Sequence, residues 1–359
     1  MLIVSGPTGG SEHDGGGHPE RPARIAAVMA GIDDLHLGTD LQIVAPYAAN
    51  LAQMTRVHDT AYLDELAAFC QAGGGQLDPD TYATADSWSA ARRAAGAGLA
   101  AVDTLRQRDD GVAFVVARPP GHHALRDRAM GFCLLNNIAI SAAALTANDE
   151  RVLIIDWDVH HGNGTQAIFW DDPNVLYVST HQWPLFPGSG TAQEIGGPRA
   201  LGRTVNVPLP AGATGDVVRR AIGEVALPAI DDFDPTWVLI SAGFDAHRAD
   251  PLAELVLSSG DFAELARMVA GFAPRPGRLV LFLEGGYDLG ALRMSVAATL
   301  GALLGDTYQP EDSTCGGPGA EMVDQARAER GTGRSTVPGR WLHLRGVFDE
   351  PTPEDRGRL

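Results

Sequence analysis

The chain has few cysteines and no long apolar run. Three cysteines, Cys70, Cys133 and Cys315, occur among 359 residues, and no two of them form a Cys-x-x-Cys pair. This odd, widely spaced set argues against a disulfide framework and a thiolate zinc site, and it suits a reducing cytoplasm. No stretch approaches the roughly 20 apolar residues of a membrane span. Residues 1–5 lack the basic and long apolar regions of a signal peptide, so the sequence predicts a cytoplasmic protein without a membrane segment.

Positive charge is also scarce. Lysine and arginine together number 27 against 45 aspartates and glutamates, which gives a formal net charge of −18 at pH 7. Such a surface repels nucleic acid and no basic cluster offsets it, so we expect no direct nucleic-acid partner. With 45% apolar and 20% charged residues, the composition is that of an ordinary globular protein, compatible with a monomer or a homo-oligomer.

Short β-favouring runs alternate with longer alanine-rich segments along most of the chain. Apolar strands separated by helices are typical of a parallel sheet covered on both faces. We therefore predict an α/β fold in residues 1–305, a single domain with an open, mostly parallel sheet sandwiched by helices. The eight expected strands are Leu2–Val4, Gln42–Ala45, Val112–Ala117, Val152–Asp156, Val175–Ser179, Thr204–Pro208, Val238–Ser241 and Leu279–Leu283. The expected helices are Ala23–Gly31, Thr60–Ala72, Ser87–Arg106, Leu135–Thr146, Asp216–Ala229, Asp261–Phe272 and Leu289–Leu304.

The composition changes near Asp306. From there it is rich in proline, glycine, glutamate and arginine, and only Trp341–Phe348 shows an apolar pattern. We expect residues 306–359 to form an appendage packed on the same domain.

Polar groups are concentrated directly after the predicted strand that begins at Val152. Carboxylates and imidazoles are costly to desolvate unless they share a partner, and a metal ion serves several at once. An Asp-x-His pair can place one oxygen and one nitrogen on the same ion. The alternative is a hydrogen-bonded polar turn without an ion. The groups concerned are Asp156, Asp158, His160, His161 and Asn163.

Polar or glycine-rich motifs follow other predicted strands. His122 and His123, which follow Val112–Ala117, suggest proton transfer. Asp245 follows a later strand, where a third metal ligand is needed, and Tyr287 follows two glycines that allow it to approach an oxyanion. Because parallel strands end at one edge of a sheet, we expect a single composite site.

These groups together indicate amide hydrolysis. Asp158, His160 and Asp245 offer three ligands and leave a fourth position open, as in catalytic zinc sites. Bound zinc lowers the pKa of its water towards about 7. The two histidines can take that proton and return it to the leaving amine, and Tyr287 can stabilise the oxyanion. No covalent enzyme intermediate is required.

Eight motifs occur in a fixed order between about Gly15 and Leu304: HPERPARI, RPPGHHA, GFCLLNN, DWDVHHGNGT, VSTH, LFPGSG, AGFDAHRADPL and LEGGY. In this order they resemble the zinc-dependent histone deacetylase family, and its class II-like bacterial amidohydrolases in particular, which have the arginase/deacetylase fold. The resemblance implies one zinc ion per chain and a structural potassium ion beneath it.

The resemblance also implies a role for each site residue. The implied zinc ligands are Asp158, His160 and Asp245. His123 is the implied base and His122 its acid or electrostatic partner, and Asp156 and Asn163 orient these two histidines. Tyr287 polarises the substrate carbonyl. The acyl-lysine channel comprises Gly131, Phe132, Phe186, Leu252, Gly285 and Gly286, and the potassium site comprises Asp156, Asp158, His160, Ser179 and Thr180. His161 has no place in this mechanism, and we expect it to make structural hydrogen bonds.

One position departs from the class I pattern of the family. Asn163 stands where those enzymes have an aspartate, and a neutral amide orients His123 without raising its pKa. Class II relatives carry asparagine there.

The implied reaction removes an acyl group, acetyl first of all, from lysine in a peptide or protein or from a small N-acyl amine. Acetylpolyamine amidohydrolases are an alternative, because they share the catalytic residues. A polyamine site is expected to carry an acidic group at the channel mouth, where Leu252 is apolar. Acidic residues that could still serve are Glu12, Asp14, Glu20 and Glu254.

Two further alternatives remain. The Asp245-Ala-His247 sequence resembles a dimanganese ureohydrolase motif, but the second metal needs more aspartates than the strand ends offer, and Asp250 is expected to cap a helix or a turn. A non-catalytic module that only binds acyl-lysine predicts the loss of a catalytic group, and none is missing. In the loop before the first helix, Glu20 is expected to pair with Arg21.

Overall fold

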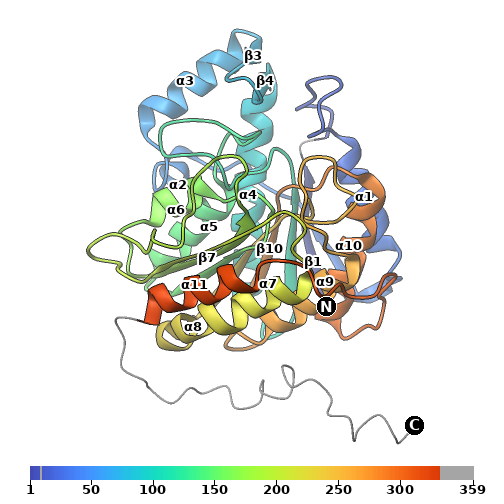
Figure 1. Cartoon of the computed structure of the whole chain (residues 1–359). Coiled ribbons are helices and arrows are strands. Elements are labelled where there is room, and N and C mark those ends of the chain that lie inside the picture. The colour runs from blue at the N-terminus through green and yellow to red at the C-terminus, as the bar shows by residue number, and fades with distance from the viewer. Residues whose placement is uncertain (9, 332–359) are drawn as a thin grey trace, which may run out of the picture.

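The computed structural model describes residues 1–8 and 10–331; Trp341–Phe348 lies outside these ranges. A parallel eight-stranded sheet runs through the molecule with helices on both faces (Figure 1). Its order is β2-β1-β5-β10-β9-β6-β7-β8, which confirms the predicted α/β fold and all eight expected strands. The strands are β1 (Leu2–Thr8), β2 (Leu41–Val44), β5 (Val112–Ala117), β6 (Val152–Asp156), β7 (Val175–Gln182), β8 (Thr204–Leu209), β9 (Trp237–Ala242) and β10 (Leu279–Leu283).

The central strands are apolar along their whole length because both faces are covered. Every residue of β5, β6, β9 and β10 is buried. Successive side chains point to opposite faces, so Leu281 packs in one core cluster and its neighbours Val280 and Phe282 in the other. These strands form the rigid floor from which the polar loops emerge.

The helices form two layers. One face carries α1 (Ala23–Asp33), α7 (Gly215–Ala221), α8 (Leu227–Phe233), α9 (Ser259–Ala270), α10 (Leu289–Leu304) and α11 (Ala320–Gly331). The other carries α2 (Leu51–Met54), α3 (Thr60–Gln71), α4 (Ser87–Arg106), α5 (Asn137–Thr146) and α6 (Asn163–Phe169). Two short strands, β3 (Gly74–Gln76) and β4 (Tyr82–Thr84), form a separate antiparallel hairpin.

The expected helix Asp216–Ala229 is interrupted in the structure. A π-helical segment, Ile222–Ala226, separates α7 from α8. Pro228 is near the start of α8 and has no N–H to donate to a carbonyl of the preceding turn, so the regular α-helical bonding is interrupted there. The helical path nevertheless continues to Phe233.

Residues 306–331 lie against the first helical face. The segment before α11 bonds to the start of α9, where Ser258 Oγ donates to Asp312 O at 2.7 Å, and α11 itself packs along α7 and β8. Among the described residues, no helix is both long and apolar enough to cross a membrane.

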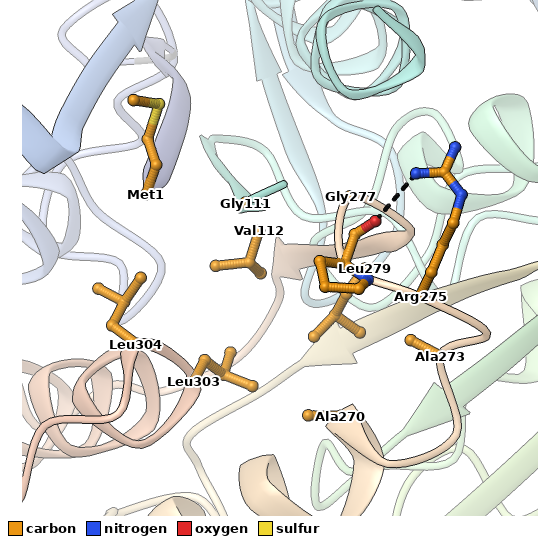
Figure 2. Close-up of a pocket in the computed structure, with 11 residues that line it drawn as sticks. Met1, Gly111, Val112, Ala270, Ala273, Arg275, Gly277, Leu279, Leu303 and Leu304 are labelled. Carbon is orange, nitrogen blue, oxygen red and sulfur yellow. Dashed lines mark hydrogen bonds between the residues drawn. The ribbon is translucent and has the colours of Figure 1, made fainter. Parts of the chain in front are cut away.

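A pocket of about 330 Å³ lies where β5 and β10 begin (Figure 2). Apolar side chains such as Leu279, Leu303 and Leu304 line it, with Arg275 as the charged member. It is at the amino ends of the strands, whereas the polar motifs follow their carboxyl ends.

Candidate active site

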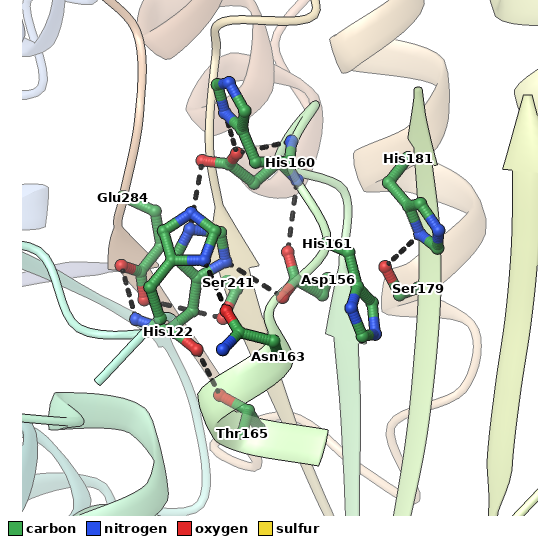
Figure 3. A network of polar contacts seen from close by, with 12 residues as sticks. His122, Asp156, His160, His161, Asn163, Thr165, Ser179, His181, Ser241 and Glu284 are labelled. Atoms are coloured by element: carbon green, nitrogen blue, oxygen red, sulfur yellow. Dashed lines mark hydrogen bonds and ion pairs between the residues drawn. The ribbon is translucent and has the colours of Figure 1, made fainter. Parts of the chain in front are cut away.

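The carboxyl ends of β5, β10, β9 and β6, which are neighbours in the sheet, bring the polar motifs together (Figure 3). His122 and His123 follow β5, Tyr287 follows β10, and Asp245 follows β9. The loop after β6 adds the remaining groups. Segments far apart in sequence therefore meet at one edge of the sheet.

Three side chains form a cluster with metal-ligand geometry. One ligand atom from each of Asp158, His160 and Asp245 lies within 4.8 Å of the others. His160 Nδ1 is 3.2 Å from Asp158 Oδ1 and 3.2 Å from Asp245 Oδ2. Burial disfavours charge on His160, but hydrogen bonds to the two carboxylates outweigh it and raise the pKa of His160 to about 10. Two buried carboxylates thus share a position that attracts a cation.

Backbone groups hold these carboxylates in place. Asp158 accepts N–H groups from His160 at 2.9 Å and from Gly285 at 2.8 Å. Asp245 accepts the N–H of Val159 at 3.0 Å. A Cβ on Gly285 would stand 1.9 Å from Asp245 Oδ2, so only glycine permits this approach. The set of one nitrogen and two oxygen donors fits a divalent ion with an open position.

The histidine pair is oriented by two different partners. His122 Nδ1 lies 3.1 Å from Asp156 Oδ2, and His123 Nδ1 lies 2.8 Å from Asn163 Oδ1. The two rings are 4.0 Å apart. Burial opposes charge on His122, but the carboxylates of Asp158 and Asp156 raise its pKa to about 10. Burial and the neighbouring His122 lower the pKa of His123, so the pair divides into a charged and a neutral member.

Tyr287 is buried close to the carboxylates of Asp245 and Asp158, and its ring packs against that of Phe132. Its backbone N–H donates to Asp250 Oδ2 at 2.7 Å, and the Arg24 guanidinium lies 5.0 Å from its ring centroid. Burial raises the pKa of Tyr287, which keeps the phenol protonated as a hydrogen-bond donor. Asp250 also accepts the N–H of Leu252 at 3.0 Å, so it caps a turn as expected.

Two aromatic side chains flank the site. The ring of Phe186 is edge-on to His123 at 5.1 Å, and that of Phe132 is edge-on to Tyr287 at 5.7 Å. Gly131 has φ +55°, and a Cβ there would approach His123 Cδ2 to 2.5 Å. Leu252 is half-buried, and Gly286, at φ +121°, leads into Tyr287.

The groups expected around potassium lie at the end of β6, in the loop that follows it and within β7. Asp156 pairs with Ser179 in the parallel register, and Thr180 follows it. The Ser179 hydroxyl lies 2.8 Å from His181 Nδ1.

His161 makes structural hydrogen bonds, as expected. Its Nδ1 lies 2.9 Å from Ser189 Oγ and its Nε2 lies 3.0 Å from Gln166 Oε1. It therefore ties the loop that carries Phe186 to α6.

The expected pairing of Glu20 with Arg21 is wrong. Glu20 is completely buried and pairs with Arg118 and Arg24. The reason is that Glu20 lies in the interior with Arg24 and Arg118, which are also buried, whereas Arg21 is exposed to solvent. Sequence reasoning also missed that His18 packs edge-on against Phe132 at 4.6 Å.

Comparison with known proteins matches this geometry to one family. The sequence profile described as the histone deacetylase domain matches residues 18–303. A probable deacetylase of Methanothermobacter thermautotrophicus is 40% identical over 323 residues, covering 88% of this chain and 95% of that protein. A histone deacetylase-like amidohydrolase of Pseudomonas aeruginosa is 40% identical over 277 residues, covering 76% and 73%.

A solved structure agrees. The crystal structure of the HDA15 HD domain superimposes with a TM-score of 0.82 at 33% identity, covering 92% of this chain and 94% of that one. The sequence profile, the relatives and the arginase/deacetylase fold all agree, and the chain therefore belongs to the histone deacetylase family.

Proposed function

We propose that this chain is a zinc-dependent deacylase that removes an acyl group, acetyl first of all, from the Nε of lysine. The observation that carries the proposal is that possible metal ligands, a histidine pair and a tyrosine lie close together. A cluster of two carboxylates and an imidazole lies beside the histidine pair, and a buried tyrosine lies close to the same two carboxylates. Metal-assisted hydrolysis of an amide uses a bound Lewis acid, a base and an oxyanion donor, and the chain offers a set of metal ligands, a histidine and a tyrosine for these roles.

In this proposal Asp158, His160 and Asp245 hold Zn²⁺, which supplies Lewis acidity for the water and the substrate carbonyl. His123 donates its Nδ1 hydrogen to Asn163 Oδ1, because the amide nitrogen of Asn163 faces Met130 Sδ at 3.3 Å. Its Nε2 lone pair is then free to take the proton of the attacking water. The pair returns that proton to the leaving nitrogen.

His122 and Tyr287 stabilise the charge that develops. The carboxylates of Asp158 and Asp156 offset the effect of burial and raise the pKa of His122, so it contributes positive charge beside the base. The Tyr287 hydroxyl donates to the oxyanion as the carbonyl becomes tetrahedral. The same proposal places a structural potassium ion among Asp156, Asp158, His160, Ser179 and Thr180.

The acidic side chains near the site favour acyl-lysine over acetylpolyamine. Glu20 is neutralised by two arginines, and Glu12 pairs with Arg93 at 2.8 Å. Glu254 accepts a hydrogen bond from Gln182 Nε2 at 3.3 Å. Asp14 is exposed and accepts the N–H of Gly16. Two of the four candidate anions, Glu20 and Glu12, are therefore paired with arginine.

The ureohydrolase alternative loses support from His247. Its Nδ1 accepts the N–H of Ala249 at 3.1 Å, and its Nε2 lies 2.9 Å from Glu311 Oε2. Neither nitrogen is free to bind a second metal ion. In the part of the chain that the structure describes, one cluster of three such ligands is present.

A substrate comparison tests the proposal. The protein is reconstituted with one equivalent of Zn²⁺ and given a fluorogenic acetyl-lysine peptide and, separately, acetylated polyamines. We expect the peptide to have the higher kcat/KM; preference for the polyamine supports the alternative. The chain contains no lysine, so acyl-lysine measured by mass spectrometry comes from the substrate alone.

Two variants test the assigned roles. Tyr287→Phe and His123→Ala should each lower kcat by about 100-fold or more, with the zinc content unchanged. Full activity in either variant contradicts its role.

A further inference from the structure

Glu284 is a buried carboxylate that the proposed mechanism does not use. It follows β10 directly, precedes the two glycines that lead to Tyr287, and is 1% exposed. Burying a carboxylate is costly unless hydrogen bonds compensate, so its contacts show what it holds.

One oxygen of Glu284 binds the turn that carries the histidine pair. Oε2 accepts the N–H of Gly121 at 2.7 Å and that of His122 at 3.2 Å. The other oxygen, Oε1, lies 3.5 Å from Ser241 Oγ at the end of β9. Figure 3 shows Glu284 beside His122 and Ser241. The side chain thus joins the ends of β5, β10 and β9, which are adjacent in the sheet.

The backbone of Glu284 is itself fixed. Its N–H donates to Ala242 O at 3.1 Å, and its carbonyl accepts a hydrogen bond from Arg24. Gly285, the next residue, donates its N–H to Asp158 at 2.8 Å. The carboxylate is therefore attached to the same segment that supports a metal ligand and carries Tyr287.

Other groups hold the carbonyl oxygens of this turn: Asn137 Nδ2 donates to Pro119 O at 3.0 Å, and the N–H of Thr165 donates to His122 O at 3.1 Å. Pro119 and Pro120 precede it and have no N–H to donate. A Cβ on Gly121 would stand 2.5 Å from Asn137 N, so the turn is closely packed against the start of α5. The Glu284 carboxylate is the acceptor for the N–H groups of Gly121 and His122.

We infer that Glu284 is a positioning residue that sets the histidine pair relative to Tyr287 and the metal ligands through hydrogen bonds to the backbone of Gly121 and His122. The inference rests on the proposed function, since it explains how that site is aligned. A misplacement of about 1 Å in such a site costs about 100-fold in rate.

Two substitutions separate geometry from charge. Because a single oxygen accepts both N–H groups, Glu284→Gln retains the acceptor and removes the charge, whereas Glu284→Ala removes both. We expect Glu284→Ala to lower kcat by about 100-fold with KM and zinc content nearly unchanged. Glu284→Gln should stay within about threefold of the wild type in kcat.

Asp261→Ala is the matched control. Asp261 is a fully buried carboxylate that also accepts backbone N–H bonds, but it does so in the capping box at the start of α9. This variant should lose stability in urea unfolding and keep its kcat. If kcat fell as much in Asp261→Ala as in Glu284→Ala, general destabilisation would explain both losses, and the inference would be overturned.

A second readout does not depend on activity. Amide hydrogen exchange at Gly121 and His122 should become faster in Glu284→Ala, and should remain slow in Glu284→Gln and Asp261→Ala. If no acyl amide is cleaved even by the wild type, the proposed function fails while the exchange result still decides the role of Glu284. Unchanged exchange in Glu284→Ala, or a Glu284→Gln variant as impaired as Glu284→Ala, overturns the inference.

Discussion

His58 is a buried histidine whose two ring nitrogens are both engaged. Nδ1 lies 2.9 Å from Leu125 O, and Nε2 accepts the N–H of Asn136 at 2.9 Å. This arrangement requires the neutral ring with its hydrogen on Nδ1. Burial lowers the pKa of His58 from 6.5 to about 4.

We predict that His58 makes the protein sensitive to acid. Because the pKa of His58 is lowered in the folded state, the unfolded chain binds this proton more readily. The contribution of His58 to the free energy of unfolding is therefore fully present above pH 6.5 and is lost as the pH falls towards 4. The contribution lost is on the order of 3 kcal/mol. Urea unfolding at pH 7, 6, 5 and 4 measures it.

A pair of variants isolates this effect. In His58→Gln the loss of stability between pH 6.5 and 4 should be smaller, whereas His36→Gln, at an exposed position, should follow the wild type. An unchanged pH dependence in His58→Gln would contradict the prediction.

At this scale, the sequence predicts chemistry best where it is local. Asp158 and His160 are two residues apart, so their spacing alone indicates a shared ion. Glu284 and Gly121 are separated by 163 residues, and nothing near either residue indicates that they meet. The available signal was a glutamate that follows five apolar strand residues, Leu279–Leu283, and is therefore buried.

The loop between β7 and β8 presents Phe186 to the site. Its ring is 38% exposed, yet it is edge-on to His123 at 5.1 Å and to His160 at 6.3 Å. A contact between His161 Nδ1 and Ser189 Oγ holds this loop in place. A half-exposed aromatic ring beside the proposed catalytic groups is suited to contact the aliphatic part of a substrate.

We predict that Phe186→Ala weakens substrate binding more than catalysis. Losing half of the burial that a phenylalanine provides is worth about 1 kcal/mol, so KM should rise about fivefold while kcat stays within about twofold. Leu201→Ala is the control, because Leu201 is 64% exposed and should leave both constants unchanged. A fall in kcat without a change in KM would contradict the assignment.

Element boundaries were predictable where hydrophobic patterns were long. The ranges expected for α4 and α10 are those observed, because each helix has a long run of buried alanine and leucine. The short α6 was missed, because Asn163–Phe169 follows the polar loop and has too few residues for a period to show. The outer helix α11 was missed as well, because few of its residues are apolar.

Metal binding should be visible in the stability of the whole molecule. Without an ion, Asp158 and Asp245 repel each other, and burial together with this repulsion raises the pKa of Asp245. An ion present at about 100 times its Kd stabilises the folded state by about 2.7 kcal/mol.

We therefore predict that removing the metal with a chelator lowers the melting temperature by several degrees and that one equivalent of Zn²⁺ restores it. Calorimetry measures both changes. The Asp245→Ala variant should not respond to added Zn²⁺; an equal response there would place the ion elsewhere.

The segment that follows α10 also contributes to the stability of the folded protein. Glu311 accepts the N–H of Ser259 at 2.8 Å and lies 2.9 Å from His247 Nε2. Its other oxygen lies 2.5 Å from the half-exposed Arg248. Burial opposes its charge, but hydrogen bonds from Ser259 and His247 outweigh it and lower the pKa of Glu311 to about 2.

We predict that Glu311→Ala lowers the free energy of unfolding by about 2 kcal/mol, because it leaves two buried groups unpaired. Arg248→Ala removes only the exposed ion pair and should cost less than about 1 kcal/mol. Equal losses in the two variants would show that the ion pair, rather than the buried bonds, matters. Urea unfolding gives both values.

The helix α11 has a consequence for how molecules of this protein meet. β8 is an edge strand of the sheet. An edge strand presents unpaired N–H and C=O groups to which a strand of another molecule can bond. Arg330 of α11 donates to Thr204 O at 2.7 Å and to Gly202 O at 2.9 Å. The opposite edge strand, β2, has only four residues, and a short edge offers few such groups. We therefore expect α11, which lies outside the matched range 18–303 and far along the chain from the candidate site, to limit the addition of a foreign strand to β8.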